Sequence, residues 1–445
     1  MSEQPDLVVA GAGGGLAGAV RAAQLGLRVL VVEASPQFGR GNNTSMSTAM
    51  VPGAGSRWQE AAGIDDSPDL FVGDIMAKTH GQADRELATS LASVSGRLVT
   101  WLADDVGLPI ELATDFAYPG HSRLRCHTIP HRRGSLLLRG LLDKATSLGV
   151  DLLTPARLTG VRDGAAVVEF PGGATETIDC GAVLLATNGF GADRDLVASH
   201  IPSMAAATYH GSAESRGDAL RIGRRLGADT AFLDAYQGHG ALATPHNTLT
   251  GWATIMHGGV LVNASGSRFG DETTGYSEFG HQVVAQPGGT AVIVLDRRIH
   301  DACLLFDDFR ETVATGALHW ADDAAGLAAR FGLDPSGLAR TLAEAHAIAS
   351  GTASDHFGRT SWEAPLEGPL GGVRVTGALF HTQGGLRVDG QARVLRPDRT
   401  PIPGLYASGG AAMSISGHGA SGYLAGNGLL PALGLALLAA EAVAA

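Results

Sequence analysis

A glycine-rich segment near the N-terminus, Gly11 to Gly18, constrains the fold of this chain more than any other feature. It reads GAGGGLAG, follows a short apolar run over residues 6–10 and opens a helical pattern that reaches Leu25; a second apolar run, LRVLVVE, ends at Glu33. Glycines at a strand-to-helix turn let backbone amides close on a diphosphate at the positive end of the helix. A carboxylate ending the second strand can accept the ribose hydroxyls of an adenosine. This order predicts a βαβ dinucleotide-binding unit.

Two registers of the glycine motif are possible. Gly11 and Gly13 would need a third glycine where the chain has a leucine, whereas the set Gly13, Gly15 and Gly18 fits the motif but starts late after the strand. We favour Gly11 and Gly13 at the turn, with Gly15 easing the start of the helix. Gly14 lies between them and is also expected to contact the cofactor.

Charge and composition exclude some classes of function. The chain has a formal net charge of -12, 44% hydrophobic residues and scattered basic residues, so a nucleic-acid partner is not expected. Cys126, Cys180 and Cys303 share no metal-ligand spacing, which argues against a disulfide framework and a metal site and favours the reducing cytoplasm. The acidic N-terminus lacks the basic start of a signal peptide. The apolar segment from Leu429 to Ala445 contains Pro431 and is interpreted as a core helix, so no membrane span is expected.

The pattern changes twice along the chain. Residues 236–380 have irregular Gly, His and Thr stretches, one strand and two alanine-rich helical segments, and afterwards the pattern of the first part returns with GGLRVD and IPGLYASGG. We therefore expect an α/β protein with domains over 1–235, 236–380 and 381–445, the first and last forming one nucleotide-binding domain interrupted by an insertion. The strand ending in ATNGFG is expected to join the first sheet.

The C-terminal part distinguishes FAD from NAD. An NAD dehydrogenase would continue with a second βαβ set. Here GGLRVD, a Pro-Ile-Pro turn and GLYASGG precede a glycine-rich stretch that opens the last helix, a pattern typical of flavoproteins whose C-terminal segment returns to hold the flavin. The sequence predicts FAD as the cofactor.

On these segments the chain resembles the fumarate reductase and succinate dehydrogenase flavoprotein superfamily, which includes tricarballylate dehydrogenase and 3-ketosteroid dehydrogenases. The segments are GAGGGLAG with Glu33, ATNGFG at 186–191, SRGDAL at 215–220, NASGSRFGDE at 263–272, HTQGGLRVD at 381–389 and PIPGLYASGG at 401–410. The resemblance implies a Rossmann-like FAD-binding domain interrupted by an inserted α+β capping domain, with the substrate bound between them against the flavin.

The resemblance also implies which residues contact FAD. Beyond the glycine loop and Glu33 they are Asn43, Thr44, Ser45, Gly189, Asp218, Gly384, Gly409, Asn427 and Leu429. Relatives with covalent FAD would need a histidine in the loop that here reads GNNTSMSTAM, which has none, and Ser45 is the equivalent position. Non-covalent FAD is therefore expected.

Four positions matter for chemistry in the fumarate-reducing branch of this superfamily. Three resemble residues of this chain: His239 in YQGHG, Arg268 in SRFGDE and His381 in FHTQGG. The fourth, an arginine before the last helix, is replaced by Tyr423. A phenol cannot copy the bidentate grip of arginine on a carboxylate, but it suits a ketone oxygen that becomes enolate-like.

These residues suggest α,β-desaturation of a small cyclic ketone or oxo-carboxylate, with hydride transfer to flavin N5. The carbonyl would be held by Tyr423 and a backbone amide near Gly426, and the proton would go to Arg268, Tyr118 or Tyr276, among which the sequence does not choose. His239 and His381 could hold a carboxylate. Arg268 could instead simply brace its own turn.

Two alternatives remain open: a fumarate- or tricarballylate-type carboxylate enzyme, and a flavin-binding protein without catalysis. The sequence has no haem-attachment motif and no cluster-binding cysteines. An external electron acceptor is therefore expected.

Overall fold

The computed structural model describes residues 4–115, 118, 120–162 and 164–445 as a mixed α/β protein with several sheets. The described chain divides into two compact units. Unit 1 combines the residues up to Ile201 with Gly211–Gln237 and His381–Ala445, and unit 2 combines Pro202–His210 with Gly238–Phe380. Each unit has its own core and is described separately.

The main sheet of unit 1 has six strands. Their order is β19 (Arg393–Leu395), β20 (Pro401–Ala407), β10 (Ala182–Leu185), β1 (Leu7–Ala10), β2 (Val29–Val32) and β6 (Asp151–Leu153). All neighbours pair in parallel except β19 with β20. β1 and β10 are buried at every position, as expected of central strands covered on both faces. The strand before ATNGFG therefore joins the first sheet, as the sequence predicted.

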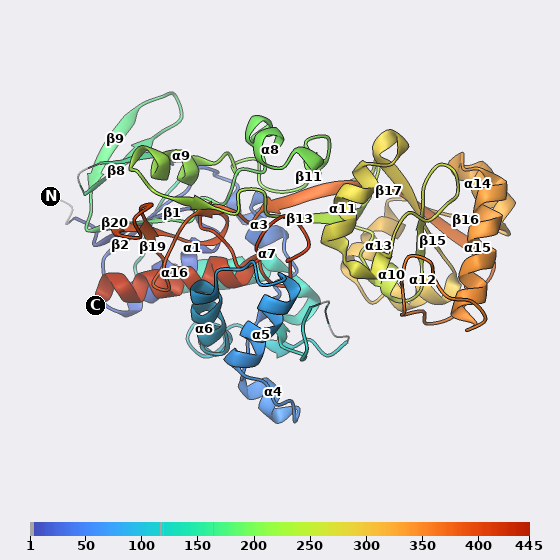
Figure 1. The fold of residues 1–445 in the computed structure, drawn as a ribbon. Helices are drawn as coiled ribbons and strands as arrows, with labels where there is room; N and C mark the ends of the chain where they lie inside the picture. The colour runs from blue at the N-terminus through green and yellow to red at the C-terminus, as the bar shows by residue number, and fades with distance from the viewer. Residues whose placement is uncertain (1–3, 116–117, 119, 163) are drawn as a thin grey trace. The chain divides into compact units, whose positions relative to one another are not determined.

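The first and last helices of unit 1 pack closely together. Figure 1 shows α16 (Leu429–Ala444) alongside α1 (Gly15–Gln24), although they lie at opposite ends of the chain. A Cβ on Gly14 would lie 2.7 Å from the Ala432 Cβ, and one on Gly18 would lie 2.9 Å from the Ala436 carbonyl oxygen. The glycines of α1 thus allow close helix packing.

Unit 1 contains further helices. They are α2 (Phe38–Gly41), α3 (Asn43–Met46), α4 (Arg57–Ala61), α5 (Pro68–Lys78), α6 (Arg85–Asp104), α7 (Gly134–Ser147), α8 (Arg194–His200) and α9 (Asp218–Arg225). The helical periodicity of the sequence continues from residue 69 to about 106, but the structure divides this stretch into α5 and α6. The chain breaks between them because His80 and Gly81 adopt φ values of 52° and 78°.

Small sheets complete unit 1. One contains β3 (Val51–Pro52), β5 (Cys126–Thr128) and β4 (Glu111–Leu112), another contains β7 (Arg157–Arg162), β8 (Ala165–Glu169) and β9 (Thr175–Asp179), and a third pairs β12 (Thr230–Ala231) with β18 (Gly385–Leu386).

Unit 2 is built on a second six-stranded sheet. It contains β11 (Thr208–Tyr209), β13 (Tyr236–Ala243), β14 (Val260–Val262), β15 (Thr290–Leu295), β16 (Leu318–Ala321) and β17 (Leu370–Thr382), with the ends of β13 and β17 continuing from unit 1. Its helices are α10 (Ala253–Met256), α11 (Tyr276–Val284), α12 (Arg297–Cys303), α13 (Asp307–Ala314), α14 (Ala324–Phe331) and α15 (Pro335–Ala349). Apolar side chains fill both faces of this sheet.

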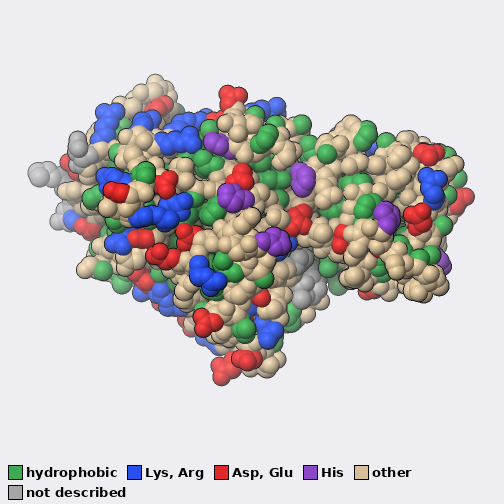
Figure 2. Space-filling view, in the orientation of Figure 1, with side chains coloured by type: hydrophobic (Ala, Val, Ile, Leu, Met, Phe, Trp, Pro, Cys, Tyr) green, Lys and Arg blue, Asp and Glu red, His purple; other side chains and the backbone are tan. Residues whose placement is uncertain are grey.

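Basic and acidic side chains are intermixed over the face drawn in Figure 2. Among the described residues, none of the helices has both the length and the hydropathy that a bilayer crossing requires.

Candidate functional site

The turn after β1 requires glycine. Gly11 has φ +109°, and its N–H donates to the Val32 carbonyl at 2.8 Å. A Cβ at this position would lie 2.3 Å from the Ala186 carbonyl oxygen. Any other residue would therefore be strained and would collide with the backbone after β10.

The N-terminus of α1 is suited to an anion. The helix begins at Gly15 with no capping side chain and no acidic residue in its first turn. A Cβ on Gly13 would lie 3.0 Å from Thr44 Oγ1, which places Thr44 beside the loop. Gly15 also allows close helix–strand packing, because its Cβ would lie 2.8 Å from a Val9 methyl group. The uncapped helix start and the helix dipole favour a diphosphate here.

Glu33 follows β2 and is 8% exposed. Its two carboxylate oxygens accept the backbone N–H groups of Ala12 at 2.7 Å and Ser35 at 2.8 Å. Burial raises the pKa of this carboxyl, and these backbone hydrogen bonds oppose the shift. Each oxygen retains acceptor capacity, so the geometry suits two further hydroxyl donors.

The predicted cofactor residues around α3 are held by local hydrogen bonds. Asn43 Oδ1 accepts the N–H of Ser212 at 2.8 Å. Ser45 Oγ donates to the Asn42 carbonyl at 2.8 Å. Asp218 opens α9 and is ion-paired with Arg157. These bonds fix the backbone of the segments that carry the three residues.

The other predicted cofactor residues lie after strands or before α16. A Cβ on Gly189 would lie 1.9 Å from Thr382 Oγ1, and one on Gly384 would lie 1.9 Å from the Phe232 carbonyl oxygen. Gly409 follows β20 with φ +59°. Leu429 is the first residue of α16, whose first turn has no acidic residue and no capping side chain. The start of α16, like that of α1, is thus an uncapped helix N-terminus that favours an anion.

Buried polar atoms test whether this region fits FAD. Among the described residues, four side-chain oxygens of unit 1 are buried without a hydrogen-bond partner: Thr187 Oγ1, Ser408 Oγ, Ser414 Oγ and Asn427 Oδ1. Thr187 follows β10, and Ser408 follows β20. Buried polar atoms are normally satisfied, so these positions fit a polar ligand such as FAD at the carboxyl edge of the sheet.

His381 and Tyr423 lie together in unit 1, with ring centroids 6.4 Å apart in an edge-on arrangement. The Thr382 carbonyl oxygen lies 3.3 Å from His381 Nδ1, which places the proton on Nδ1 because a carbonyl only accepts. Burial lowers the pKa of His381 to about 4, so the imidazole is neutral at pH 7. A Cβ on Gly428 would lie 2.9 Å from His381 Nε2, which places this ring at the start of α16.

Tyr118 reaches the same segment from another part of unit 1. Its ring packs against a buried cluster of Met50, Ala113, Cys126 and Ala425. Its hydroxyl accepts a hydrogen bond from Arg132 at 3.1 Å, and burial raises the pKa of this phenol. The structure therefore brings Tyr118, His381, Tyr423, Asn427 and Leu429 to the segment from 423 to 429 or its immediate neighbours.

His239 belongs to unit 2 and lies within an aromatic cluster. Its ring stacks on Tyr276 at 4.9 Å and on Phe380 at 5.3 Å, and Trp252 meets it edge-on at 5.8 Å. Nδ1 accepts the backbone N–H of Ala241 at 3.1 Å, so the proton lies on Nε2. Burial lowers the pKa of His239 to about 3. The ring is a neutral donor.

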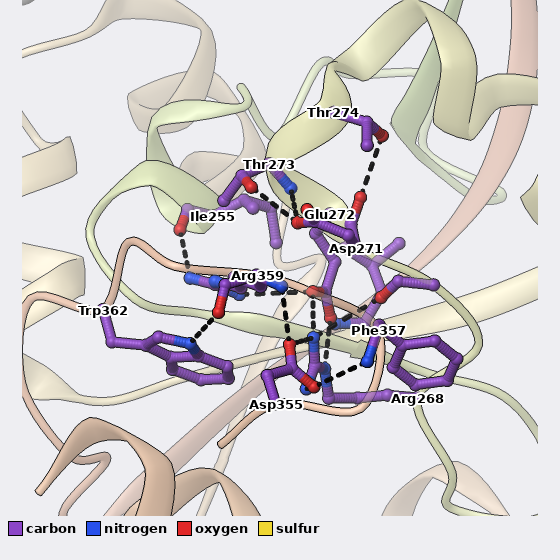
Figure 3. A network of polar contacts seen from close by, with 12 residues as sticks. Ile255, Arg268, Asp271, Glu272, Thr273, Thr274, Asp355, Phe357, Arg359 and Trp362 are labelled. Carbon is purple, nitrogen blue, oxygen red and sulfur yellow. Dashed lines mark hydrogen bonds and ion pairs between the residues drawn. The ribbon is translucent and has the colours of Figure 1, made fainter. Parts of the chain in front are cut away.

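Arg268 is held by two carboxylates of unit 2 (Figure 3). It donates to both oxygens of Glu272, at 2.8 and 2.7 Å, and to both oxygens of Asp355, each at 3.0 Å. Its side chain is 6% exposed. Burial alone would lower the pKa of Arg268, but the hydrogen bonds to Glu272 and Asp355 outweigh burial and raise it.

A second arginine extends this network. Arg359 donates to the carbonyl oxygens of Gly259 at 2.9 Å and Ile255 at 3.0 Å, and contacts Glu272 at 3.3 Å (Figure 3). The ion pair with Glu272 corresponds to the local bracing that the sequence offered as the alternative for Arg268, whereas Asp355 and Arg359 were missed. No local pattern links residues so far apart in the chain.

Comparison with known proteins finds a matching family model and similar proteins of known name. The family model described as "FAD binding domain" matches residues 6–429. An NADH:fumarate oxidoreductase of Klebsiella pneumoniae is 27% identical over 420 residues, covering 93% of this chain but 45% of the relative. A 4-oxocyclohexanecarboxylate 2-dehydrogenase of Sinomonas cyclohexanicum is 25% identical over 536 residues, covering 99% of this chain and 92% of the relative.

Solved structures share the fold. A flavocytochrome c3 fumarate reductase in an open conformation has a TM-score of 0.85 at 25% identity, with 100% of this chain and 78% of that chain covered. A 3-ketosteroid-Δ4-(5α)-dehydrogenase of Rhodococcus jostii RHA1 has a TM-score of 0.78 at 24% identity, with 100% and 97% covered.

Proposed function

Because the chain belongs to the family of flavoproteins that share the FAD binding domain, we propose that it desaturates the carbon–carbon bond beside the carbonyl of a small cyclic ketone or oxo-carboxylate. The match over residues 6–429 confirms the predicted flavoprotein resemblance and FAD as the cofactor. The relatives are named as oxidoreductases, so the chain is an FAD-dependent oxidoreductase rather than a flavin-binding protein without catalysis. The choice of a ketone and the residue roles that follow are our proposal.

Unit 1 is assigned as the Rossmann-like FAD-binding domain and unit 2 as the inserted capping domain. The parallel order of β10, β1 and β2, with a glycine turn and Glu33 at its carboxyl edge, supports the first assignment. The α+β composition of unit 2 supports the second. The proposed domain ranges are 1–235, 236–380 and 381–445; the compact units differ from them in that Pro202–His210 groups with unit 2 and unit 1 extends to Gln237.

The state of Arg268 is the observation that carries the choice of a ketone. A carboxylate-reducing site needs cationic side chains that can grip its substrate. Arg268 has its charge matched by Glu272 and Asp355 in a nearly inaccessible position, and Tyr423 replaces the other expected arginine. The retained residues therefore offer neutral donors, which suit a carbonyl oxygen.

Tyr423 and the Gly426 amide are proposed to hold that oxygen. The phenol O–H and the backbone N–H would both donate to a ketone oxygen that gains negative charge as the neighbouring C–H bond breaks. FAD, held by the glycine turn, Glu33 and the start of α16, supplies hydride acceptance at N5. Residues 424–427 are buried, which would limit access of water to the developing enolate.

Tyr276 is the proposed proton acceptor. It is the first residue of α11, and its ring stacks on the neutral His239 ring at 4.9 Å. The hydroxyl of Tyr118 already accepts from Arg132, which makes it the weaker candidate. Arg268 would have to break four hydrogen bonds to carboxylate oxygens before it could exchange a proton.

The Nε2–H of His239 is proposed to bind the carboxylate of an oxo-acid substrate. The relative named for 4-oxocyclohexanecarboxylate supports a substrate that carries both a ketone and a carboxylate. His381 is the weaker candidate, because its Nε2 is the unprotonated nitrogen.

A carboxylate enzyme of the fumarate or tricarballylate type is the second candidate, favoured by the fumarate reductases among the relatives. Anaerobic titration of the oxidised holoenzyme separates the two candidates. We expect 4-oxocyclohexanecarboxylate and cyclohexanone to bleach the flavin absorbance with loss of two hydrogens from the substrate, and succinate and tricarballylate to leave it unchanged. Bleaching by the acids alone would overturn the ketone proposal.

A further inference from the structure

His121 joins two parts of unit 1 through both ring nitrogens. Its Nε2 lies 3.0 Å from the Ala425 carbonyl oxygen, and its Nδ1 lies 3.3 Å from Arg125 Nη1. A carbonyl only accepts and a guanidinium only donates. The two partners therefore fix one neutral tautomer, with the proton on Nε2 pointing at Ala425.

The arginine that contacts this imidazole is buried and held by several partners. Arg125 is 1% exposed, donates to Asp66 at 2.9 and 2.7 Å, pairs with Asp74 and lies over the Phe71 ring at 4.6 Å. Burial lowers the pKa of His121 to about 4, and the charge of Arg125 adds to the shift. The imidazole therefore stays neutral and keeps its orientation near pH 7.

The hydrogen bond from His121 is accepted by the Ala425 carbonyl. The same peptide group includes the Gly426 N–H, which we propose contacts the substrate. The carbonyl of Ala425 and the N–H of Gly426 belong to the same peptide plane. Gly426 has φ +86°, and a Cβ there would lie 2.4 Å from Pro52 Cδ, so this backbone is held by packing. A donor on the carbonyl polarises the peptide and makes its N–H a stronger donor.

We infer that His121 is a positioning residue that polarises the Ala425–Gly426 peptide, so that the Gly426 N–H binds the enolate-like oxygen of a ketone more strongly than the ketone itself. The inference rests on the proposed function, because it assigns this N–H to the substrate carbonyl. A series of hydrogen bonds and ion pairs links Asp66 and Asp74 to Arg125, Arg125 to His121, and His121 to the Ala425–Gly426 peptide. This series stabilises the negative charge on the enolate-like oxygen without placing a charged side chain at the substrate.

The bond itself can be tested in the holoenzyme without turnover. Labelling with alanine carbonyl carbon-13 and glycine nitrogen-15 restricts the NMR spectrum to Ala–Gly peptides, which include Ala425–Gly426. We expect the Ala425 carbonyl resonance to move upfield in His121→Leu and to be partly restored in His121→Gln, whose amide can donate. An unmoved resonance would overturn the inference.

His127 provides a matched control. It is another buried histidine, 1% exposed, bonded to Ser56 Oγ at 2.7 Å and to the Arg125 carbonyl oxygen at 2.9 Å. His127→Gln should leave the Ala425 resonance in place. If His121→Leu fails to fold, nitrogen-15 spectra of the wild-type imidazole decide instead: a protonated Nε2 and unprotonated Nδ1 support the inference, and the opposite tautomer overturns it.

Kinetics with 4-oxocyclohexanecarboxylate test the consequence. His121→Leu should lower kcat about tenfold with a smaller change in KM, whereas His127→Gln should keep both. The probe 4-hydroxybenzoate, labelled at C4, should bind as a phenolate to wild type and shift toward the phenol in His121→Leu. Equal losses of kcat in the two variants would overturn the inference. A wild type that never oxidises a ketone would overturn the proposed function, while the Ala425 resonance would still decide whether the bond polarises the peptide.

Discussion

Arg268 and Asp355 lie 87 positions apart in the sequence, and the guanidinium donates to both carboxylate oxygens of Asp355 at 3.0 Å. The pair ties the loop after β14 to the segment that precedes β17. Because the Asp355 side chain is fully buried, this ion pair belongs to the interior of unit 2.

Replacement Asp355→Ala should strongly destabilise unit 2. Removing one partner of a buried ion pair leaves an uncompensated charge and costs about 3–5 kcal/mol. Calorimetric or denaturant unfolding of the holoenzyme measures this loss. The exposed Asp301, with 64% of its side chain accessible, gives the control: Asp301→Ala should change stability by less than about 0.5 kcal/mol. Equal effects of the two changes would show that the Arg268 pair is not structural.

Replacement Tyr423→Phe should reduce kcat for 4-oxocyclohexanecarboxylate on the order of 100-fold, as loss of one oxyanion donor does in other enzymes. FAD content should be unchanged, because the phenol is assigned to the substrate. The control is Tyr406→Phe in β20, a side chain assigned no part in the reaction. Full activity of Tyr423→Phe would show that Tyr423 does not bind the substrate carbonyl.

Mild acid should destabilise the protein. Burial lowers the pKa values of His121 and His127 to about 4 and that of His239 to about 3, whereas an unfolded chain protonates histidine at about 6.5. Below about pH 6.5 the unfolded state therefore binds more protons, and the free energy of unfolding should fall by on the order of 1 kcal/mol per pH unit for each histidine until about pH 4.

Urea unfolding between pH 7 and pH 4 measures this slope. His121→Gln should make the slope shallower, because one buried neutral imidazole is removed. The aspartates of buried ion pairs, such as Asp66 and Asp355, have lowered pKa values and add to the loss only below about pH 4. Constant stability from pH 7 to pH 4.5 would contradict the prediction.

Replacement Gly11→Ala should abolish FAD binding. Backbone strain at positive φ costs about 1–3 kcal/mol, and the contact with the Ala186 carbonyl adds to it. Flavin absorbance per protein after purification measures the loss. Gly39→Ala is the control, because a Cβ there meets nothing within 4 Å. Normal flavin content in Gly11→Ala would show that the turn can rearrange.

Much of unit 1 could be predicted because its signals are local. The apolar runs of β1, β2 and β10 are short and uninterrupted, and the glycines of the intervening turn lie where a parallel sheet requires them. The break between α5 and α6 could not be predicted, since the helical pattern continues through it and only the positive φ of His80 and Gly81 ends the first helix.

Individual residues of the candidate site could be predicted from the sequence, but their partners could not. Motif resemblance proposed Arg268, His239, His381 and Tyr423, but the carboxylate that engages Arg268 from the other side is Asp355, and nothing in the intervening sequence indicates it. Likewise the contact of His121 with Ala425 joins residues 304 positions apart. Such pairings depend on tertiary packing, which leaves no periodic trace in a single sequence.

The close contact of α1 with α16 also bears on biosynthesis. β1 and β2 leave the ribosome early, whereas β20 and the helix that packs on Gly14 and Gly18 are made after unit 2. The last strand of the nucleotide-binding sheet, β20, is therefore made only at Pro401–Ala407, and α1 gains its partner helix only when residues beyond Leu429 have been synthesised. Until then, the surface of α1 that packs on α16 has no partner, so we expect folding of unit 1 to finish only after the last helix is made.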